Sequence, residues 1–317
     1  MRARPDLLPG TPGTLYERIG TGHPYWYRVY YAAPGRQVED LVSARDDGDA
    51  LDAAREQIDF AKWVARQVAD LRKLEFQVAD KSVARVLVEL HNLRAFEAGL
   101  VVVGTLCYMA WLNEMGVKAV SLRTQDVDLA RRQRLKLDAP LGFLEAMQAT
   151  KLPFAAVPGL SGGEPPTSVK LPGAEGLRVD MLAAGPRIGA TLAIPELRWH
   201  AQAIPHYDYL LAGARPGAIL AGGHCVPVRL PAPERLVWHK LFSSAARTGA
   251  PEKAAKDLLQ AATLAAVLVE QEDESLAESA RATPVALRLA ARKRLPAIRK
   301  ALVAHPQVLE QIEAGLA

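Results

Sequence analysis

The stretch of residues 100–130 constrains the fold more than any other part of the chain. It opens with the apolar run 100–103, rich in valine, which is typical of a buried strand and is ended by Gly104 and Thr105. Apolar residues then recur at helical spacing from position 107 to position 115. The pattern predicts a strand, a tight turn and a helix. The first backbone N–H groups of such a helix lie at the glycine turn and can bind phosphate oxygens.

Two carboxylates follow in an alternating segment. Asp126 and Asp128 are separated by Val127, so in a strand both carboxylates point to one face while the apolar side chains point to the core. Two carboxylates on one face repel each other unless a divalent cation lies between them. Mg²⁺ takes acidic oxygens from protein and completes its octahedron with water and substrate phosphates. A solvated strand edge is the alternative for an isolated Asp-x-Asp, but the order of strand, glycine turn, helix and acidic strand favours a site for Mg²⁺ or Mn²⁺.

These residues resemble the polymerase-beta-like nucleotidyltransferase superfamily. Its pattern is an apolar strand, Gly-Gly or Gly-Ser, a helix and Asp-x-Asp, with a third acid on a later strand. This chain has Gly104-Thr105 at the glycine turn, which keeps the hydroxyl and adds a methyl group. Over residues 93–268 it also looks like a bacterial family of nucleotidyltransferase-fold proteins that is distantly similar to toxin nucleotidyltransferases of abortive-infection systems.

The resemblance assigns roles to later residues. Asp180 lies among apolar residues, where a lone charge is costly unless it is paired or binds a metal. It corresponds to the third carboxylate of the family, which binds a second metal ion or acts as base on the attacking hydroxyl. Lys240 corresponds to a lysine that binds phosphate, and Asp257 to a late acid that, with Lys256 before it, closes the nucleotide pocket. On sequence alone, all three lie in ordinary amphipathic helices.

Composition limits the class of protein. The chain has 317 residues, half of them hydrophobic, which is enough for two domains with a substantial core. Cys107 and Cys225 lack metal-site spacing, so we expect a cytoplasmic protein with reduced thiols. No apolar run approaches the roughly 20 residues of a membrane span, so no membrane partner is expected. The net charge of +4 weakly favours polyanionic partners such as nucleotides or RNA. The basic cluster of residues 131–136 could contact such a partner or form an exposed loop.

The chain is expected to be an α+β protein with three regions. Residues 1–92 would form a β-hairpin and a helical extension, because strand patterns at 25–31 and 37–42 precede helical periodicity over 49–97. Residues 93–232 would form the nucleotidyltransferase domain, a mixed β-sheet flanked by helices, with further strands at 204–211 and 219–220. Residues 233–317 would be entirely helical.

The sequence therefore predicts a metal-dependent nucleotidyltransferase that transfers NMP from a nucleoside triphosphate to an acceptor and releases pyrophosphate. The acceptor stays open: tRNA or another RNA, a protein side chain or a small molecule. One alternative is the toxin of a toxin–antitoxin pair, whose partner would be an antitoxin protein. Another is a catalytically silent module that keeps the fold and binds nucleic acid or a partner, and the presence of all three acids argues against it.

Overall fold

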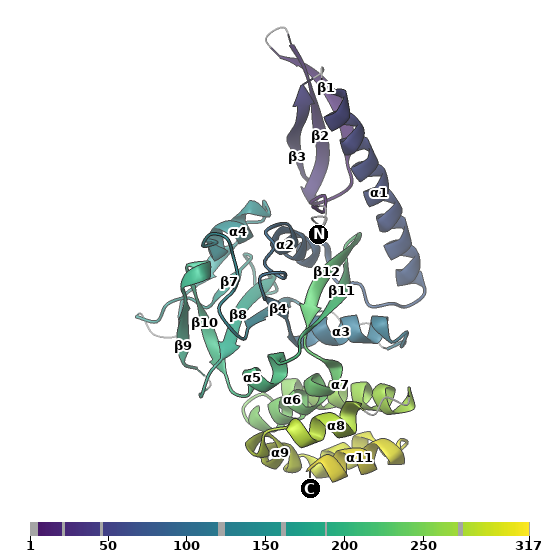
Figure 1. Ribbon diagram of the computed structural model, residues 1–317, viewed down its shortest axis with the longest axis vertical. Coiled ribbons are helices and arrows are strands. Elements are labelled where there is room, and N and C mark those ends of the chain that lie inside the picture. The colour runs from purple at the N-terminus through teal and green to yellow at the C-terminus, as the bar shows by residue number, and fades with distance from the viewer. Residues whose placement is uncertain are drawn as a thin grey trace.

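The computed structural model describes residues 6–20, 23–44, 47–119, 124–159, 163–187, 189–271 and 275–316. The molecule is elongated (Figure 1). An N-terminal arm projects from one end, a body of strands and helices fills the middle, and C-terminal helices stack at the other end. The arrangement is the α+β class that the sequence predicts.

The arm is a three-stranded antiparallel sheet with one long helix beside it. Its elements are β1 (Thr14–Gly20), β2 (His23–Ala33), β3 (Arg36–Ala44) and α1 (Gly48–Lys73). β2 and β3 are the predicted hairpin. β1 was not predicted, because each of its two faces carries both polar and apolar side chains. α1 begins where Asp47 accepts a hydrogen bond from the backbone N–H of Ala50.

The helical pattern of residues 49–97 is divided into two helices. The chain leaves α1 at Glu75, whose φ of 71° is left-handed, and re-enters a helix at α2 (Lys81–Asn92). α2 packs inside the body, with Val83, Val86 and Leu87 completely buried. The region boundaries at 92 and 232 stay a prediction, although α2 itself lies in the core of the body.

The body is built on a seven-stranded sheet whose main order is β4-β5-β8-β10-β9. Its strands are β4 (Val101–Val102), β5 (Asp126–Arg131), β6 (Ala155–Val157), β7 (Ser168–Lys170), β8 (Arg178–Ala184), β9 (Thr191–Ile194) and β10 (Trp199–Ile204). β5 and β8 run parallel at its centre, and β4 joins β5 antiparallel. α3 (Gly104–Glu114) follows β4, so the predicted order of strand, turn and helix is confirmed.

Shorter elements surround this sheet. They are α4 (Phe143–Ala149), the 3-10 turn η1 (Pro195–Leu197), α5 (Tyr207–Leu211), and the two-stranded ribbon of β11 (Arg215–Ala221) and β12 (His224–Leu230). The predicted strand at 204–211 is wrong, because β10 ends at Ile204 and α5 follows. His206 has a φ of 62°, and this left-handed residue turns the chain into the helix.

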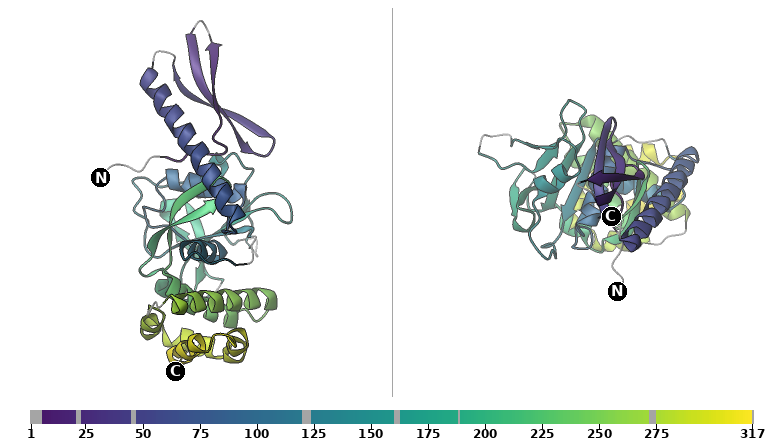
Figure 2. Two further views of the ribbon diagram at one scale, coloured as in Figure 1. Left: turned by 90° about the vertical axis from the view of Figure 1, so that its right-hand side faces the viewer. Right: turned by 90° about the horizontal axis from the view of Figure 1, so that it is seen from above.

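The C-terminal region is helical, as predicted. Its helices are α6 (Pro233–Ala246), α7 (Pro251–Glu270), α8 (Ser275–Ala282), α9 (Val285–Arg292), α10 (Leu295–Ala301) and α11 (Pro306–Leu316). α6 and α7 begin with proline, whose missing N–H costs nothing in the first turn. The left view in Figure 2 places the last helices at the end opposite the arm. None of the helices in the described ranges combines the length and the apolar character that a membrane span requires.

Candidate active site

The three predicted acids lie on one face of the central sheet. In the parallel register of β5 and β8, Asp128 is the partner of Asp180, and Asp126 is the partner of Arg178. Neighbouring strands are about 4.8 Å apart, and residues two apart along a strand share a face, so the acids form a cluster. Asp126 is exposed and Asp128 is half-buried, whereas Val127 between them is buried. The alternation predicted for this strand is confirmed.

The cluster is electrostatically unfavourable for Asp128. The pKa of the Asp128 carboxyl is raised to about 6, mainly by burial and then by the negative charges of Asp180 and Asp126. Lys240 and Arg247 lower this pKa without cancelling the rise. A carboxylate in this position is stabilised by any cation that lies close to it.

The turn after β4 is fitted closely around Asp128. Gly104 has a φ of 69°, and a Cβ at this position would lie 2.0 Å from Asp128 Oδ2. Glycine is therefore required both by the backbone conformation and by the approach of the carboxylate. The Val103 N–H donates to the Asp128 carbonyl at 2.9 Å, which ties the turn to β5. Thr105 is half-exposed, and α3 has no side-chain cap, so its first N–H groups are open beside the acids.

Lys240 and Asp257 form an ion pair between α6 and α7. Lys240 Nζ lies 3.0 Å from Asp257 Oδ1, and Arg247 Nε lies 2.9 Å from Asp257 Oδ2. Lys240 is only 5% exposed and Asp257 only 7%. Because Lys240 and Arg247 both influence the pKa of Asp128, this part of the helical layer faces the acids. Contact between Lys240 and phosphate stays a prediction.

Lys256, which the family resemblance pairs with Asp257, is a further cation at this site. The side chain is exposed, in contrast to Lys240. Surrounding protein atoms and the Lys240 charge lower the pKa of Lys256, whereas Asp257, Asp126 and Asp128 oppose this effect. It is therefore close enough to the two acids of β5 to be affected by both.

Asp180 is already paired. Its Oδ1 accepts hydrogen bonds from Arg178 Nε at 2.7 Å and from Ser168 Oγ, and Arg178 Nη2 donates to Ser168 Oγ at 2.8 Å. Across the described residues, no group of three His, Cys, Asp or Glu side chains is arranged to hold a metal ion. Ser168 was missed because β7 and β8 meet only in the folded chain. Arg178 lies two residues before Asp180 on the same strand, so the strand period of two was a signal that could have found it.

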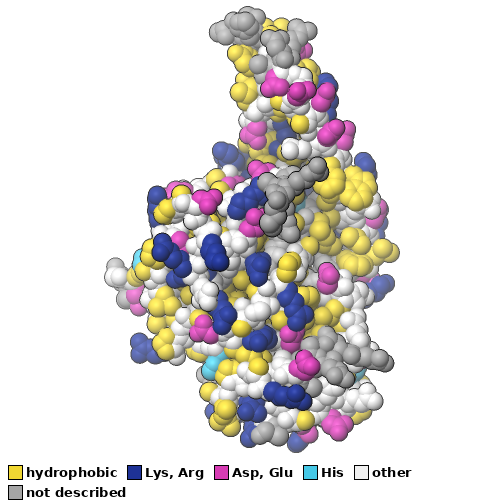
Figure 3. Space-filling model, viewed as in Figure 1, with side chains coloured by type: hydrophobic (Ala, Val, Ile, Leu, Met, Phe, Trp, Pro, Cys, Tyr) yellow, Lys and Arg dark blue, Asp and Glu magenta, His cyan; other side chains and the backbone are white. Residues whose placement is uncertain are grey.

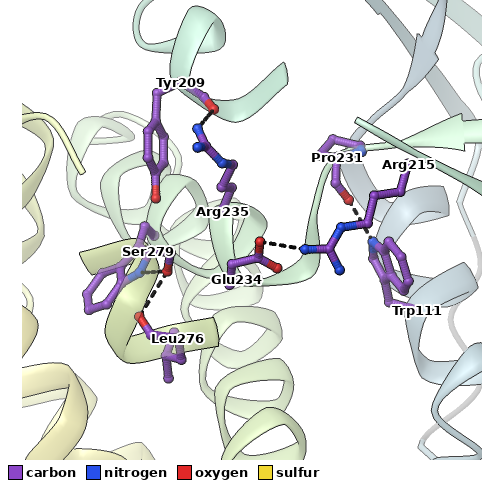
Figure 4. Close-up of polar contacts among 9 residues, drawn as sticks. Trp111, Tyr209, Arg215, Pro231, Glu234, Arg235, Leu276 and Ser279 are labelled. Atoms are coloured by element: carbon purple, nitrogen blue, oxygen red, sulfur yellow. Dashed lines mark hydrogen bonds and ion pairs between the residues drawn. The ribbon is translucent and has the colours of Figure 1, made fainter. Parts of the chain in front are cut away.

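Polar contacts anchor α6 and the segment before it to the body (Figure 4). They are Trp111 Nε1 to the Pro231 carbonyl at 2.9 Å, Arg215 Nη2 to Glu234 Oε1 at 2.9 Å, and Arg235 Nη1 to the Tyr209 carbonyl at 2.7 Å. All lie at the beginning of the helix, ahead of Lys240. The position of Lys240 relative to the sheet is therefore set by contacts with α3, α5 and β11.

Two other regions lie apart from the acids. Arg131, which begins the basic cluster of residues 131–136, is the last residue of β5, whereas Asp126 is the first, and Arg131 pairs with buried Glu196 at 2.9 Å. A large cavity of about 1160 Å³ lies between α1, α2 and β12 and has mainly apolar walls that include Phe60 and Trp63. Figure 3 shows hydrophobic side chains gathered beside α1. The residues that line this cavity include none of the predicted site residues.

Replacing Lys240 with methionine is expected to destabilise the protein. The variant leaves the buried Asp257 with Arg247 as its remaining cation, and breaking a buried ion pair commonly costs about 3 kcal/mol or more. The sequence alone places Lys240 in an ordinary amphipathic helix and does not show that it is buried. Denaturant unfolding measures the effect, and Lys240→Met with Asp257→Leu is the matched control, since it removes both charges. A single variant as stable as the wild type would contradict the prediction.

A family model described as nucleotidyltransferase matches residues 81–284, which is more than half of the chain. The match begins with α2 and ends just before α9, so it contains the central strands, α6, α7 and every predicted site residue. Comparisons with curated proteins and with solved structures gave no match.

Proposed function

Because the chain belongs to the nucleotidyltransferase family, we propose that it transfers a nucleoside monophosphate from a nucleoside triphosphate to an acceptor hydroxyl in a metal-dependent reaction. The observation that carries the proposal is the position of Asp128. Its carboxylate lies against Gly104, beside Asp126 and Asp180, with Lys240 and Arg247 close enough to influence its pKa. The acids on the sheet can bind a metal ion that accompanies the substrate. The cations of the helical layer can bind the phosphates of the same substrate.

The residues present fit a divalent cation. Carboxylate oxygens are the ligands that Mg²⁺ prefers. The raised pKa of Asp128 reflects burial first and repulsion by Asp180 and Asp126 second, and a bound cation would offset both. Asp126 and Asp128 would hold Mg²⁺ or Mn²⁺, with Asp180 as the third carboxylate. When bound, the cation neutralises charge on the substrate phosphates and on the departing pyrophosphate.

The side chains and backbone of the chain supply the remaining functions. The open N–H groups at the start of α3 bind phosphate oxygens, and Lys256 adds positive charge from the opposite side. The acceptor oxygen forms a bond to the α-phosphorus, and the bond from that phosphorus to the oxygen bridging to the β-phosphate breaks. Asp180 receives the proton of the acceptor hydroxyl, and pyrophosphate leaves.

The test is incubation with each of the four nucleoside triphosphates labelled at the α-phosphate, together with Mg²⁺ and total cell extract. We expect wild-type protein to transfer label from at least one of them and Asp126→Asn to transfer none. Digestion of the labelled product with ribonuclease or with protease then identifies an RNA or a protein acceptor. Absence of transfer from all four triphosphates, with Mg²⁺ and with Mn²⁺, would contradict the proposal.

Lys256→Ala is expected to weaken binding of the triphosphate with its metal by about 5- to 150-fold, corresponding to about 1–3 kcal/mol for a charge-assisted contact. Stability should not change measurably, because the side chain is exposed. Titration calorimetry with a non-hydrolysable triphosphate measures the affinity. Lys300→Ala on α10 is the control, since this lysine is also exposed. Equal losses in the two variants would remove Lys256 from the site.

A further inference from the structure

Two rows of polar side chains cross the sheet from β7 to β5. In the first row Ser168 is the register partner of Asp180, and Asp180 is the partner of Asp128. In the second row Arg178 lies beside Asp126. Arg178 and Asp180 are two residues apart on β8 and therefore share its polar face. Asp180 thus lies between an acid on one side and a serine on the other, with an arginine in the next row.

Arg178 and Ser168 together hold one oxygen of Asp180. The guanidinium donates to Asp180 Oδ1 at 2.7 Å and to Ser168 Oγ at 2.8 Å, and the serine hydroxyl donates to the same Oδ1. Each of the three side chains is therefore hydrogen-bonded to the other two, and the Arg178 guanidinium contacts both Asp180 and Ser168. Asp180 therefore has a cation of its own.

The exposure of the three side chains is unequal. Ser168 is 2% exposed and the Asp180 side chain 19%, whereas the Arg178 side chain is 41% exposed. Arg178 can therefore leave the set without unpacking the sheet, and Ser168 cannot. A guanidinium is well matched to phosphate, because it donates two parallel hydrogen bonds to oxygens of a triphosphate as readily as to a carboxylate.

A guanidinium and a divalent cation compete for the same carboxylate oxygens. While Arg178 holds Oδ1, Asp180 offers less negative charge to a metal at Asp126 and Asp128. This arrangement agrees with the finding that, over the described ranges, no three acidic, histidine or cysteine side chains converge on a metal position.

We infer that Arg178 is a positioning residue that keeps Asp180 away from the metal position until a nucleoside triphosphate binds and takes the guanidinium. Asp180 then joins Asp126 and Asp128, so the complete acidic set forms only with substrate present. The inference rests on the proposed function, because it assigns Asp180 to the metal-binding set. It adds an order of events: metal alone binds weakly, and metal with nucleotide binds tightly.

Mn²⁺ binding tests the inference without measuring turnover. The free ion gives an electron paramagnetic resonance signal that decreases on binding, and it is titrated with and without a non-hydrolysable nucleoside triphosphate. In wild-type protein the nucleotide should tighten Mn²⁺ binding by 5-fold to 150-fold, the usual range of coupling between two ligands. Arg178→Met should bind Mn²⁺ about 5-fold tighter than wild type in the absence of nucleotide, and its response to nucleotide should be smaller. Arg178→Lys, which restores the charge, should return towards the wild-type values.

Two further variants make the result decisive. Ser168→Ala removes the other donor to Asp180 and should change Mn²⁺ affinity in the same direction by a smaller factor, which also decides the question if Arg178→Met does not fold. Arg18→Met is the matched control, because Arg18 is an exposed arginine paired with Glu39 at 3.4 Å on the arm. Its Mn²⁺ affinity should equal that of wild type.

The outcomes separate the inference from the proposed function. If wild-type protein binds Mn²⁺ and nucleotide together, but folded Arg178→Met and Ser168→Ala bind Mn²⁺ no more tightly than wild type, the pair is structural and only the inference is overturned. If wild-type protein binds neither Mn²⁺ nor the triphosphate, the proposed function fails and the inference fails with it.

Discussion

Asp128→Asn is expected to lower nucleotidyl transfer by at least about 10²-fold, because loss of one positioned carboxylate commonly costs that much. Asp128 is the acid next to both of the others, and it lies against the glycine turn at the start of α3. Asparagine has nearly the same shape, so the turn is kept while the negative charge is lost. Turnover measured under saturating Mg²⁺ tests the loss. A variant with wild-type turnover would show that this acid has no part in the reaction.

The same substitution is expected to stabilise the folded protein at neutral pH. Asp128 has a higher pKa in the folded protein, about 6, than the ordinary 3.8. Such an acid stabilises the fold while it is protonated, so its contribution is complete below pH of about 4 and is lost as the pH rises through about 6. Above that pH the charged form is a cost of about 1–3 kcal/mol that asparagine removes. In the absence of metal, the variant should unfold at a higher temperature than wild type at pH 8, and the difference in unfolding temperature should be smaller at pH 4. A variant less stable than wild type at pH 8 would contradict this origin of the shift.

Gly104→Ala is expected to remove most of the activity, and Gly116→Ala to leave it intact. The two glycines have nearly the same backbone conformation, with φ of 69° and 66°. They differ in their surroundings: a Cβ on Gly104 would lie 2.0 Å from Asp128 Oδ2, whereas a Cβ on Gly116 would have no neighbour within 4 Å. Each substitution carries about 1–2 kcal/mol of left-handed backbone strain. Only Gly104→Ala also displaces the carboxylate, and misplacement by about 1 Å can cost 10²-fold in rate.

This pair of variants separates strain from site geometry. Denaturant unfolding of both proteins gives the common cost of strain, and turnover gives the additional effect at Gly104. Similar turnover in the two variants would mean that the position of Asp128 does not matter for the chemistry. A loss of activity confined to Gly104→Ala would support the assignment of the turn to the site.

The fold was predictable where its signal is local. The prediction of a strand, a glycine turn and a helix from residue 100 onward was correct. Each of these elements has a signal in consecutive residues, either a periodicity of apolar side chains or a glycine. The helical C-terminal region was correct for the same reason. The end of α1 just before Glu75 and the presence of α5 in place of a predicted strand were missed. In both places a non-glycine residue adopts a left-handed conformation, which tertiary contacts impose and which composition does not reveal.

The candidate site was predictable only in part. The sequence placed Asp126 and Asp128 on one face, because the side-chain period of a strand is two. It did not give the register between β5 and β8, which brings Asp180 beside Asp128 from 52 positions later in the chain. Strand register across such a separation depends on the packed sheet. For the same reason the sequence could not show that Ser168 of β7 contacts Asp180. The burial of Lys240 depends likewise on how α6 and α7 pack in the folded chain.

The most direct test of the central claim is the position of Mn²⁺ in crystals grown with a non-hydrolysable nucleoside triphosphate. Anomalous scattering locates Mn²⁺ independently of any assumption about the ligands. The account predicts a peak bound by carboxylate oxygens of Asp126 and Asp128, with the triphosphate between the start of α3 and Lys256. Nucleotide bound with its Mn²⁺ at another place, or crystals that contain nucleotide and no peak at these two acids, would contradict it.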